Sequence, residues 1–457
     1  MKKLALLFIG LIVISCNQAQ EKSNPKGILI SNINIVDVRN GVIRENRNII
    51  IDSGKIMAIE QSVEDATKFK ETIDGTGKFA VPGLAEMHAH IPSPNTSQER
   101  IEEVLFLYLS NGVTTIRGML GHPSHLEMRS KAAAGELLSP RIFTSSPSLN
   151  GLTVRTPEEA RTKVTAFQKD GYDFLKIHPG ILLNVFDELV ATANEVGIRF
   201  SGHVPVAVGI RHALESQYAS IDHVDGYLEG LVPESENVNP AANGFFGYNF
   251  TPLADPEKID ELVAMTKANK VWIVPTQSLF ERWFAPVGVE ELLAQPEMKY
   301  MPKTTLANWE RVKREYMADE NFSPEQWKKF DEIRKRLINR LQENGYGMLL
   351  GSDAPQLFNV PGFSIHHEIQ GMLDAGLTPL QILQSGTINP AIFFEKEGEF
   401  GEIGVGQSAD LFIINSNPLT DLSALKEPIG VMVRGTWLSR SHIDSKLAQI
   451  AKNAEKN

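Results

Sequence analysis

Six residues of types that bind metal ions or move protons fall near the ends of short apolar runs in the chain. Two of them, His88 and His90, are two positions apart in AVPGLAEMHAH, and alternation along a strand points both imidazoles to the same side. The other four lie in four later runs, DFLKIHP, IRFSGHVP, ASIDHVDG and YGMLLGSDAP. The full set is His88, His90, Lys176, His203, His223 and Asp353. Imidazole nitrogens and carboxylate oxygens are the usual ligands of catalytic zinc, so the set predicts a metal site.

The number of candidate ligands indicates how many ions that site holds. Four histidines and one aspartate exceed the three protein ligands of a typical single catalytic zinc. We therefore expect two divalent metal ions, taken to be zinc, and a metal-assisted hydrolysis.

Eight strand-like runs alternate with segments of helical period and position these residues. Alternation of this kind is typical of repeated βα units and a parallel sheet. Eight such units close a barrel, whose active site lies at the carboxyl ends of the strands, where the six residues fall. The sequence predicts an α/β fold, a (β/α)8 TIM barrel over residues 81–394. The runs are AVPGLAEMHAH, GVTTIRGM, PRIFTSSPS, DFLKIHP, IRFSGHVP, ASIDHVDG, VWIVPTQS and YGMLLGSDAP.

Both ends of the chain carry strand patterns of a different kind. ILISNINIVDV and NIIIDSGKIMAIE lie before the barrel, and SADLFIIN and IGVMVRGTWL lie after it. Alternating strands at each end need partners to bury their apolar faces. We expect residues 27–80 and 395–440 to form one composite β-sandwich domain beside the barrel.

Two segments of the chain are additional to the strands and helices of a minimal barrel. The first, near 231–252, is rich in Pro, Asn and Gly, and the second, near 290–344, is charged and carries Trp309 and Trp327 at an amphipathic period. They follow the sixth and seventh strands and so emerge on the catalytic face. We expect them to form a lid over the barrel mouth.

The N-terminus has the pattern of a secretion signal. Lys2 and Lys3 precede an apolar run that is too short to span a bilayer, which predicts a signal peptide over residues 1–15. The run ends in VISC, which resembles the lipobox of bacterial lipoprotein precursors. The resemblance implies lipidation of Cys16, a tether over residues 16–26 and a lipid-anchored place in the bacterial cell envelope.

Composition narrows the classes of partner. The chain has 45 Lys and Arg against 56 Asp and Glu and a net charge of −11, and it has no basic cluster of the kind that binds nucleic acid or an anionic membrane. With one cysteine, it has neither an internal disulfide nor, once Cys16 is lipidated, a catalytic thiol. The expected partner is a small-molecule substrate, with membrane contact only through the lipid anchor; a homo-oligomer is left open.

The motifs around these residues resemble those of a known family. VPGLAEMHAHI, GYDFLKIHPG, GSDAP, LQSGTINPAIFF and GEIGVGQSADLFIINSNPL recur in the order found in the amidohydrolase superfamily. Within it, the chain is most similar to the imidazolonepropionase-like and metal-dependent Xaa-Pro dipeptidase branch.

The resemblance implies a role for each ligand. His88, His90 and Asp353 would bind one metal and His203 and His223 the other, with Lys176 carboxylated on its amine to bridge the two. An uncarboxylated lysine is protonated at neutral pH and is a poor ligand, so this role depends on the modification. A metal-bridging hydroxide would attack the substrate carbonyl, and Asp353 would pass the proton to the leaving amine.

The substrate is less defined, because the chain departs from its relatives. It has SPSLNGLTVRT where the dipeptidases carry Gly-Gly-His-Gly, and Gly202-His203-Val204 where they carry His-Ala-His. Their substrate contacts therefore do not transfer, and the candidates here are Arg117, His178 and Tyr227, which lie near strand ends.

Several functions fit such a site. The first is hydrolysis of an amide of the dipeptide or N-acyl amino acid type. A lactone or phosphotriester hydrolase could use the same site, and a binding lipoprotein could have kept the fold without catalysis. A deaminase fits less well. The deaminases of this superfamily place a Glu shortly after the strand-5 histidine and lack the strand-4 lysine, whereas here Val204-Pro205-Val206 follows His203 and Lys176 is present.

Overall fold

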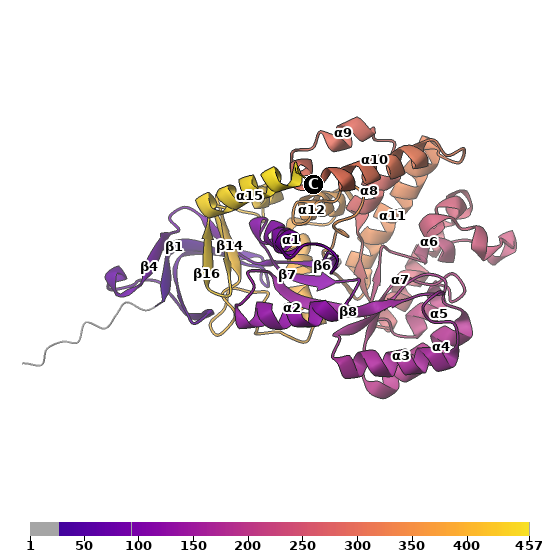
Figure 1. Ribbon diagram of the computed structural model, residues 1–457, viewed down its shortest axis with the longest axis horizontal. Coiled ribbons are helices and arrows are strands. Elements are labelled where there is room, and N and C mark those ends of the chain that lie inside the picture. Colours follow the sequence, from indigo (N-terminus) through magenta and orange to yellow (C-terminus); the bar gives the residue numbers. More distant parts are fainter. Residues whose placement is uncertain (1–26, 93, 457) are drawn as a thin grey trace, which may run out of the picture.

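The structure is a computed structural model that describes residues 27–92 and 94–456. It has two parts, a small β-rich part that holds strands from both ends of the chain and a larger part in which helices surround a parallel sheet (Figure 1). Cys16 and the expected signal peptide lie outside the described residues. Among the helices that are described, none is long and apolar enough to cross a bilayer.

The larger part is built on eight parallel strands in sequence order, which confirms the α/β class and the parallel sheet. Backbone hydrogen bonds from Met87 N to Leu350 O, Asp353 N to His88 O and His90 N to Ala354 O join the first strand to the segment after the last. The sheet therefore curls back on itself. Its strands are β6 (Leu84–Ala89), β7 (Val113–Gly118), β8 (Arg141–Leu149), β9 (Phe174–Ile177), β10 (Phe200–Gly202), β11 (Ser220–Asp222), β12 (Trp272–Val274) and β13 (Gly347–Met348).

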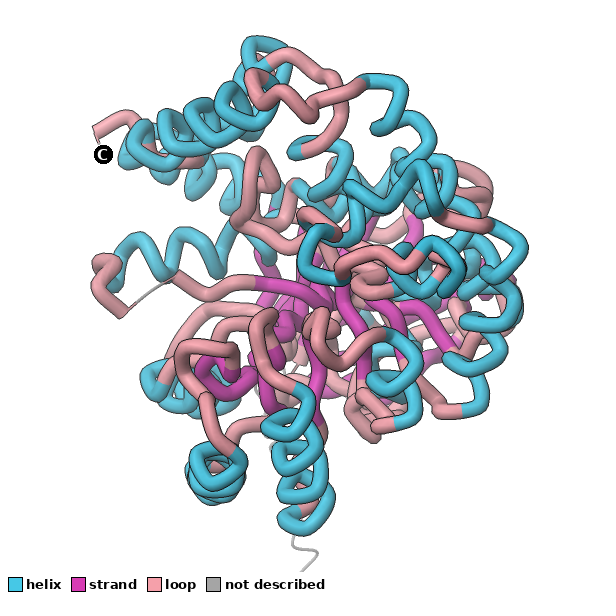
Figure 2. Tube along the Cα trace, turned by 90° about the vertical axis from the view of Figure 1, so that its right-hand side faces the viewer, coloured by secondary structure: helices cyan, strands magenta, loops and turns pink. Residues whose placement is uncertain are grey.

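Helices surround this sheet (Figure 2). Their limits follow local sequence signals: in α3, the Thr156 side chain accepts from Glu159 N, Pro157 occupies the first turn, and Gly171 ends the helix in a left-handed conformation. The helices between and after the strands are α1 (Gln98–Ser110), α2 (Pro123–Ala134), α3 (Pro157–Asp170), α4 (Leu183–Val196), α5 (Ile210–Glu215), α6 (Tyr227–Gly230), α7 (Ile259–Ala268), α12 (Ser364–Asp374), α13 (Pro379–Gly386) and α14 (Ile388–Phe393).

The two extra segments are largely helical. The first forms short 3-10 turns, η2 (Glu234–Glu236), η3 (Pro240–Ala242) and η4 (Phe245–Leu253). The second, together with the helix before it, comprises α8 (Gln277–Trp283), α9 (Val289–Leu293), η6 (Pro296–Tyr300), α10 (Lys303–Met317) and α11 (Pro324–Asn344). One face of α11 is buried, with Trp327, Phe330 and Leu337 at helical spacing, as its amphipathic pattern predicts.

The small part contains strands from both ends of the chain. β5 pairs in parallel with β1 and antiparallel with β14, so the N- and C-terminal segments share one sheet. We expected a sandwich, but these strands are hydrogen-bonded as a single mixed sheet of eight strands, in the order β16-β15-β14-β5-β1-β2-β3 with β4 also on β1. They are β1 (Ile28–Asp37), β2 (Val42–Asp52), β3 (Lys55–Glu60), β4 (Glu71–Asp74), β5 (Phe79–Pro82), β14 (Leu411–Ile414), β15 (Gly430–Val433) and β16 (Thr436–Ser439), followed by helix α15 (Arg440–Ala454).

Candidate active site

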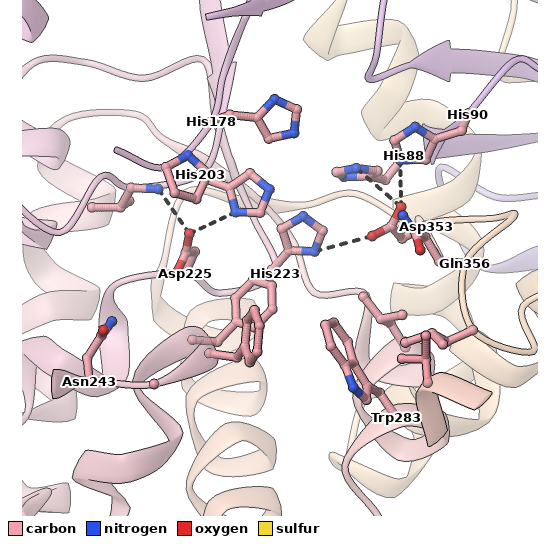
Figure 3. A pocket seen from close by; sticks show the side chains of 18 of the residues that line it. His88, His90, His178, His203, His223, Asp225, Asn243, Trp283, Asp353 and Gln356 are labelled. Atoms are coloured by element: carbon pink, nitrogen blue, oxygen red, sulfur yellow. Dashed lines mark hydrogen bonds and ion pairs between the residues drawn. The ribbon is translucent and has the colours of Figure 1, made fainter. Parts of the chain in front are cut away.

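Five of the six predicted ligands line one cavity at the carboxyl ends of the barrel strands, and we call this set the catalytic floor. Its members are His88, His90, His203, His223 and Asp353. Several lie at sharp turns just past a strand: His223 and Asp353 have positive φ angles of 66° and 64°. The chain turns there, and the side chains point from different strands into a common space (Figure 3).

His88, His90 and Asp353 form the tightest group. Asp353 Oδ1 lies 2.7 Å from His90 Nε2 and 3.6 Å from His88 Nε2. One ligand atom from each residue lies within 4.8 Å of the others, a spacing that could hold a metal ion. The arrangement agrees with the prediction that both strand-1 histidines face the same side.

His203 and His223 lie beside this group. The ring centroid of His223 is 4.6 Å from that of His88 and 4.6 Å from that of His203. The four floor imidazoles thus form a continuous cluster, with Asp353 Oδ2 4.0 Å from His223 Nδ1.

Three of these rings have an oxygen close behind their Nδ1 atom. His88 Nδ1 lies 3.1 Å from Asp222 Oδ2, His203 Nδ1 lies 3.0 Å from Asp225 Oδ2, and His223 Nδ1 lies 2.8 Å from Thr276 Oγ1. Such contacts fix the orientation of a metal-binding histidine and leave the other nitrogen for the metal. This donor set therefore fits a metal centre.

Lys176 lies beneath the floor and is completely buried. Its Nζ has no hydrogen-bond partner, and the nearest carboxylate oxygen, Asp222 Oδ2, is 4.0 Å away. Burial lowers the pKa of this amine to about 8. A bare ammonium without partners is costly to bury, whereas a carboxylated amine that binds metal would satisfy the position.

Burial also determines the charges on the floor. It holds the pKa values of His88 and His223 well below the usual value for histidine, so both rings are neutral and available as ligands. For Asp353, burial favours the neutral acid, but its hydrogen bond and attraction to His90 and the nearby Lys176 outweigh it and lower the pKa to about 2. The floor thus offers neutral nitrogens and one carboxylate.

The cavity above the floor has a volume of about 550 Å³. Most of its upper lining is apolar, and we call six of these residues the outer wall: Phe245, Phe246, Leu279, Trp283, Trp309 and Val312. They come from η4, α8 and α10. Figure 3 shows Trp283 across the cavity from His178. The two segments predicted to form a lid therefore both contribute residues to the cavity.

The second segment also reaches the floor from behind. Arg334 of α11 donates to the carbonyl oxygens of His223 at 2.7 Å and Pro275 at 2.9 Å. Within this segment, α10 lines the cavity and α11 supports the backbone of a predicted ligand.

The three predicted substrate contacts have different positions. His178 lines the cavity, its ring 5.1 Å from that of His203 and its Nδ1 2.6 Å from Ser148 Oγ. Arg117 and Tyr227 are buried and are absent from the cavity lining. Arg117 donates to Met87 O, Ser220 Oγ and Asp222 Oδ1, and the Tyr227 hydroxyl pairs with Thr266, so both are engaged inside the protein.

Two carboxylates beside the floor histidines were not among the predicted site residues. Asp222 bridges Arg117 and His88, and Asp225 holds both the His203 ring and Val204 N. The signal was available: both flank His223 within ASIDHVDG, so one short run supplies a ligand and two supporting carboxylates.

Sequence comparisons place the chain among relatives with distinct activities. It is 23% identical to an imidazolonepropionase of Geobacillus sp. (strain WCH70) over 399 residues, which cover 82% of this chain and 84% of that protein. A shorter stretch of 92 residues is 37% identical to an adenine deaminase of Desulforamulus reducens. That stretch spans 20% of this chain and 15% of the deaminase.

Solved structures share the fold over nearly the whole chain. Bottromycin amidohydrolase superimposes with a TM-score of 0.72 at 20% identity, covering 94% of this chain and 91% of that one. A Xaa-Pro dipeptidase with bound methionine superimposes with a TM-score of 0.64 at 20% identity, covering 90% and 99%. The model of the amidohydrolase family matches residues 79–438, which include both the catalytic floor and the outer wall. The chain therefore belongs to the amidohydrolase family.

Proposed function

We propose that the protein is a binuclear metal-dependent hydrolase of amide bonds. The observation that carries the proposal is the position of Lys176. This buried amine has no hydrogen-bond partner and lies directly beneath a cluster of four imidazoles and one carboxylate. In a carboxylated form this lysine would give the site a further anionic ligand. His88, His90 and Asp353 would hold one metal, and His203 and His223 would hold the other.

The chain's own residues then prepare the reaction. When bound, the two divalent cations supply an activated water and polarise the substrate carbonyl. Asp353 is ionised because of its low pKa, and its Oδ1 faces both His88 and His90, so it can accept a proton at the centre of the floor. It then delivers that proton to the departing amine.

The dipeptidase and imidazolonepropionase relatives favour carbon–nitrogen bonds as the target. A lactone or phosphotriester substrate is the second candidate, because the same activated water attacks those electrophiles. A screen of dipeptides, N-acyl amines, lactones and organophosphates against the zinc-loaded protein separates the two. Faster turnover of a lactone or phosphotriester than of every amide would reject the proposal.

The number of metals is tested separately with Lys176→Ala. Removing the shared anionic ligand leaves the two cations less compensated, so metal content falls from two equivalents toward one. Lys313→Ala is the matched control, since Lys313 is also a buried lysine but binds the carbonyl oxygens of Trp283 and Ala285, away from the floor. Two equivalents in Lys176→Ala would contradict the bridging role, and no bound metal in the wild type would favour a non-catalytic binding protein.

We also propose that Cys16 carries a lipid anchor, because the run that ends at this cysteine, VISC, resembles a lipobox. Mass spectrometry of membrane-extracted protein checks this: the expected mature chain begins at an acylated Cys16. An unmodified N-terminus elsewhere would contradict it.

A further inference from the structure

We infer that the substrate is a neutral amide with a bulky aromatic or branched apolar group and without a free carboxylate near the scissile bond. The inference deepens the proposed amide hydrolysis and rests on it. It narrows the substrate away from free dipeptides and N-acyl amino acids, both of which carry a carboxylate close to the cleaved bond.

The charges around the cavity are the first argument. Among the described residues that line it, none is a lysine or an arginine, while Asp225 and Asp353 are both acidic. Arg117, Arg334 and Lys176 lie behind the lining. Arg117 pairs with Asp222, and Arg334 binds the carbonyl oxygens of His223 and Pro275. Lys176 is buried beneath the floor, where the proposed carboxylation removes its positive charge. A substrate carboxylate in the upper cavity, away from the metals on the floor, would lose its water without gaining a cationic side chain as a partner.

The outer wall supplies the second argument. Phe245 and Trp283 have ring centroids 5.2 Å apart, and Phe246 lies 5.4 Å from His223 and 4.9 Å from Phe280. Phe246 therefore forms a direct link between the wall and the floor. Aromatic rings at this spacing bind another ring by stacking and by exclusion of water.

The exposure of the wall supports a ligand rather than a closed core. Phe245 is 61% exposed at the mouth, although its neighbours Phe246 and Trp283 are partly covered. Polar contacts in the upper cavity come from the neutral amides of Asn243, Asn308 and Gln356. A cavity of about 550 Å³ with apolar walls and neutral hydrogen-bonding groups matches an uncharged ligand of moderate size.

A matched pair of amides tests the inference. N-Benzoyl-2-phenylethylamine and N-benzoyl-phenylalanine have the same rings and scissile bond and differ by one carboxylate. With the zinc-loaded protein we expect kcat/KM to be at least about 10-fold higher for the neutral amide, because no side chain of the cavity lining gives the carboxylate a cationic partner. Equal or faster hydrolysis of the carboxylate compound would overturn the inference.

A substitution elsewhere in the cavity lining tests the same argument by adding a positive charge. Val206 lines the cavity and is 41% exposed, so Val206→Arg places a cation there without disturbing the core. It should raise several-fold the ratio of kcat/KM for N-benzoyl-phenylalanine to kcat/KM for the neutral amide, and Val206→Met controls for size. The same response to both substitutions would contradict the role of charge.

Binding separates this inference from the proposed function. In metal-loaded Asp353→Asn, quenching of tryptophan fluorescence should report tighter binding of the neutral compound, since Trp283 and Trp309 line the cavity. If the wild type hydrolyses neither compound but the variant prefers the neutral one, amide hydrolysis is rejected and the preference of the wall stands. If the variant binds neither or prefers the carboxylate, the inference itself fails.

Discussion

The catalytic floor and the outer wall face the same cavity but are built in different ways. Each floor residue lies at or past the carboxyl end of a strand of the curled sheet, and three of the histidines have a supporting oxygen behind the ring, as His203 has from Asp225. The wall comes from η4, α8 and α10, which lie between the last strands, and it packs through aromatic rings. The floor therefore determines which reaction occurs, and the wall determines which molecule is presented to it. Substitutions in the two regions should give separable effects.

The largest effect should come from the floor carboxylate. In Asp353→Asn the amide oxygen can still approach a metal, but the side chain cannot carry a proton to the leaving amine. Turnover should fall by about 10²-fold or more, with metal content largely kept. Kinetics and metal analysis on the same preparation check this. Near-normal turnover would show that the proton moves by another route.

A smaller effect is expected at Asp222, which lies behind the floor histidine His88. Asp222→Asn keeps an oxygen for Arg117 but removes the negative charge beside His88 Nδ1, so the imidazole becomes a weaker ligand. Metal affinity should fall by about 10- to 100-fold at one of the two positions. Chelator competition measures it, and Asp225→Asn is the matched control that should affect the position of His203 instead. If both variants release the same ion, the assignment of two separate positions is wrong.

Substitution in the outer wall should not change the metal content of the protein. In Trp283→Ala a ring is removed from the cavity while the floor contacts stay, so KM for an aromatic amide should rise by about 10-fold at constant metal content. N-Acetylethylamine, which has no ring to stack, is the control substrate and should be affected much less. Loss of bound metal in this variant would mean that floor and wall are not separable.

The floor could be predicted from sequence because its signals are local. Each of the eight strand-like runs corresponds to a strand of the curled sheet, and His88 and His90 share a side because alternation requires it. Asp222 and Asp225 were within reach, next to a predicted ligand. Arg117 looked like a substrate contact because its position near a strand end does not reveal that it turns inward to Asp222.

The wall could not be predicted, because its residues have no common period. Phe245 and Phe246 lie in irregular 3-10 turns with a left-handed residue at Phe246, and Phe245 meets Trp283 only through the packing of distant segments. The single sheet of the small part was missed for a related reason. Strand patterns at the two ends predict pairing, but the parallel contact of β5 with β1 depends on tertiary context.

The smallest functional effect is expected at Glu368, where α12 contacts the start of α8, one of the helices that carry the outer wall. Glu368 of α12 is buried and accepts hydrogen bonds from Gln277 N at 2.9 Å and Ser278 N at 2.8 Å, at the start of the helix that carries Trp283. Burial raises its pKa to about 7, although these hydrogen bonds oppose the shift. Glu368→Gln can keep one of the contacts, so kcat/KM should change by less than about 3-fold.

The stability of this variant should nevertheless depend on pH in a different way. Between the ordinary glutamate value of about 4.3 and a pKa of about 7, the folded protein keeps a proton on Glu368 that the unfolded chain releases, so this group lowers stability as the pH rises through that window. Glutamine has no such proton. The unfolding free energy of Glu368→Gln relative to wild type should therefore increase by on the order of 1 kcal/mol from pH 5 to pH 8, measured by urea denaturation at each pH. Glu257→Gln, at an exposed carboxylate with 84% side-chain exposure, should give a curve parallel to wild type. A parallel curve for Glu368→Gln as well would mean that Glu368 is ionised in the folded protein and that the attachment of α8 depends on its charge.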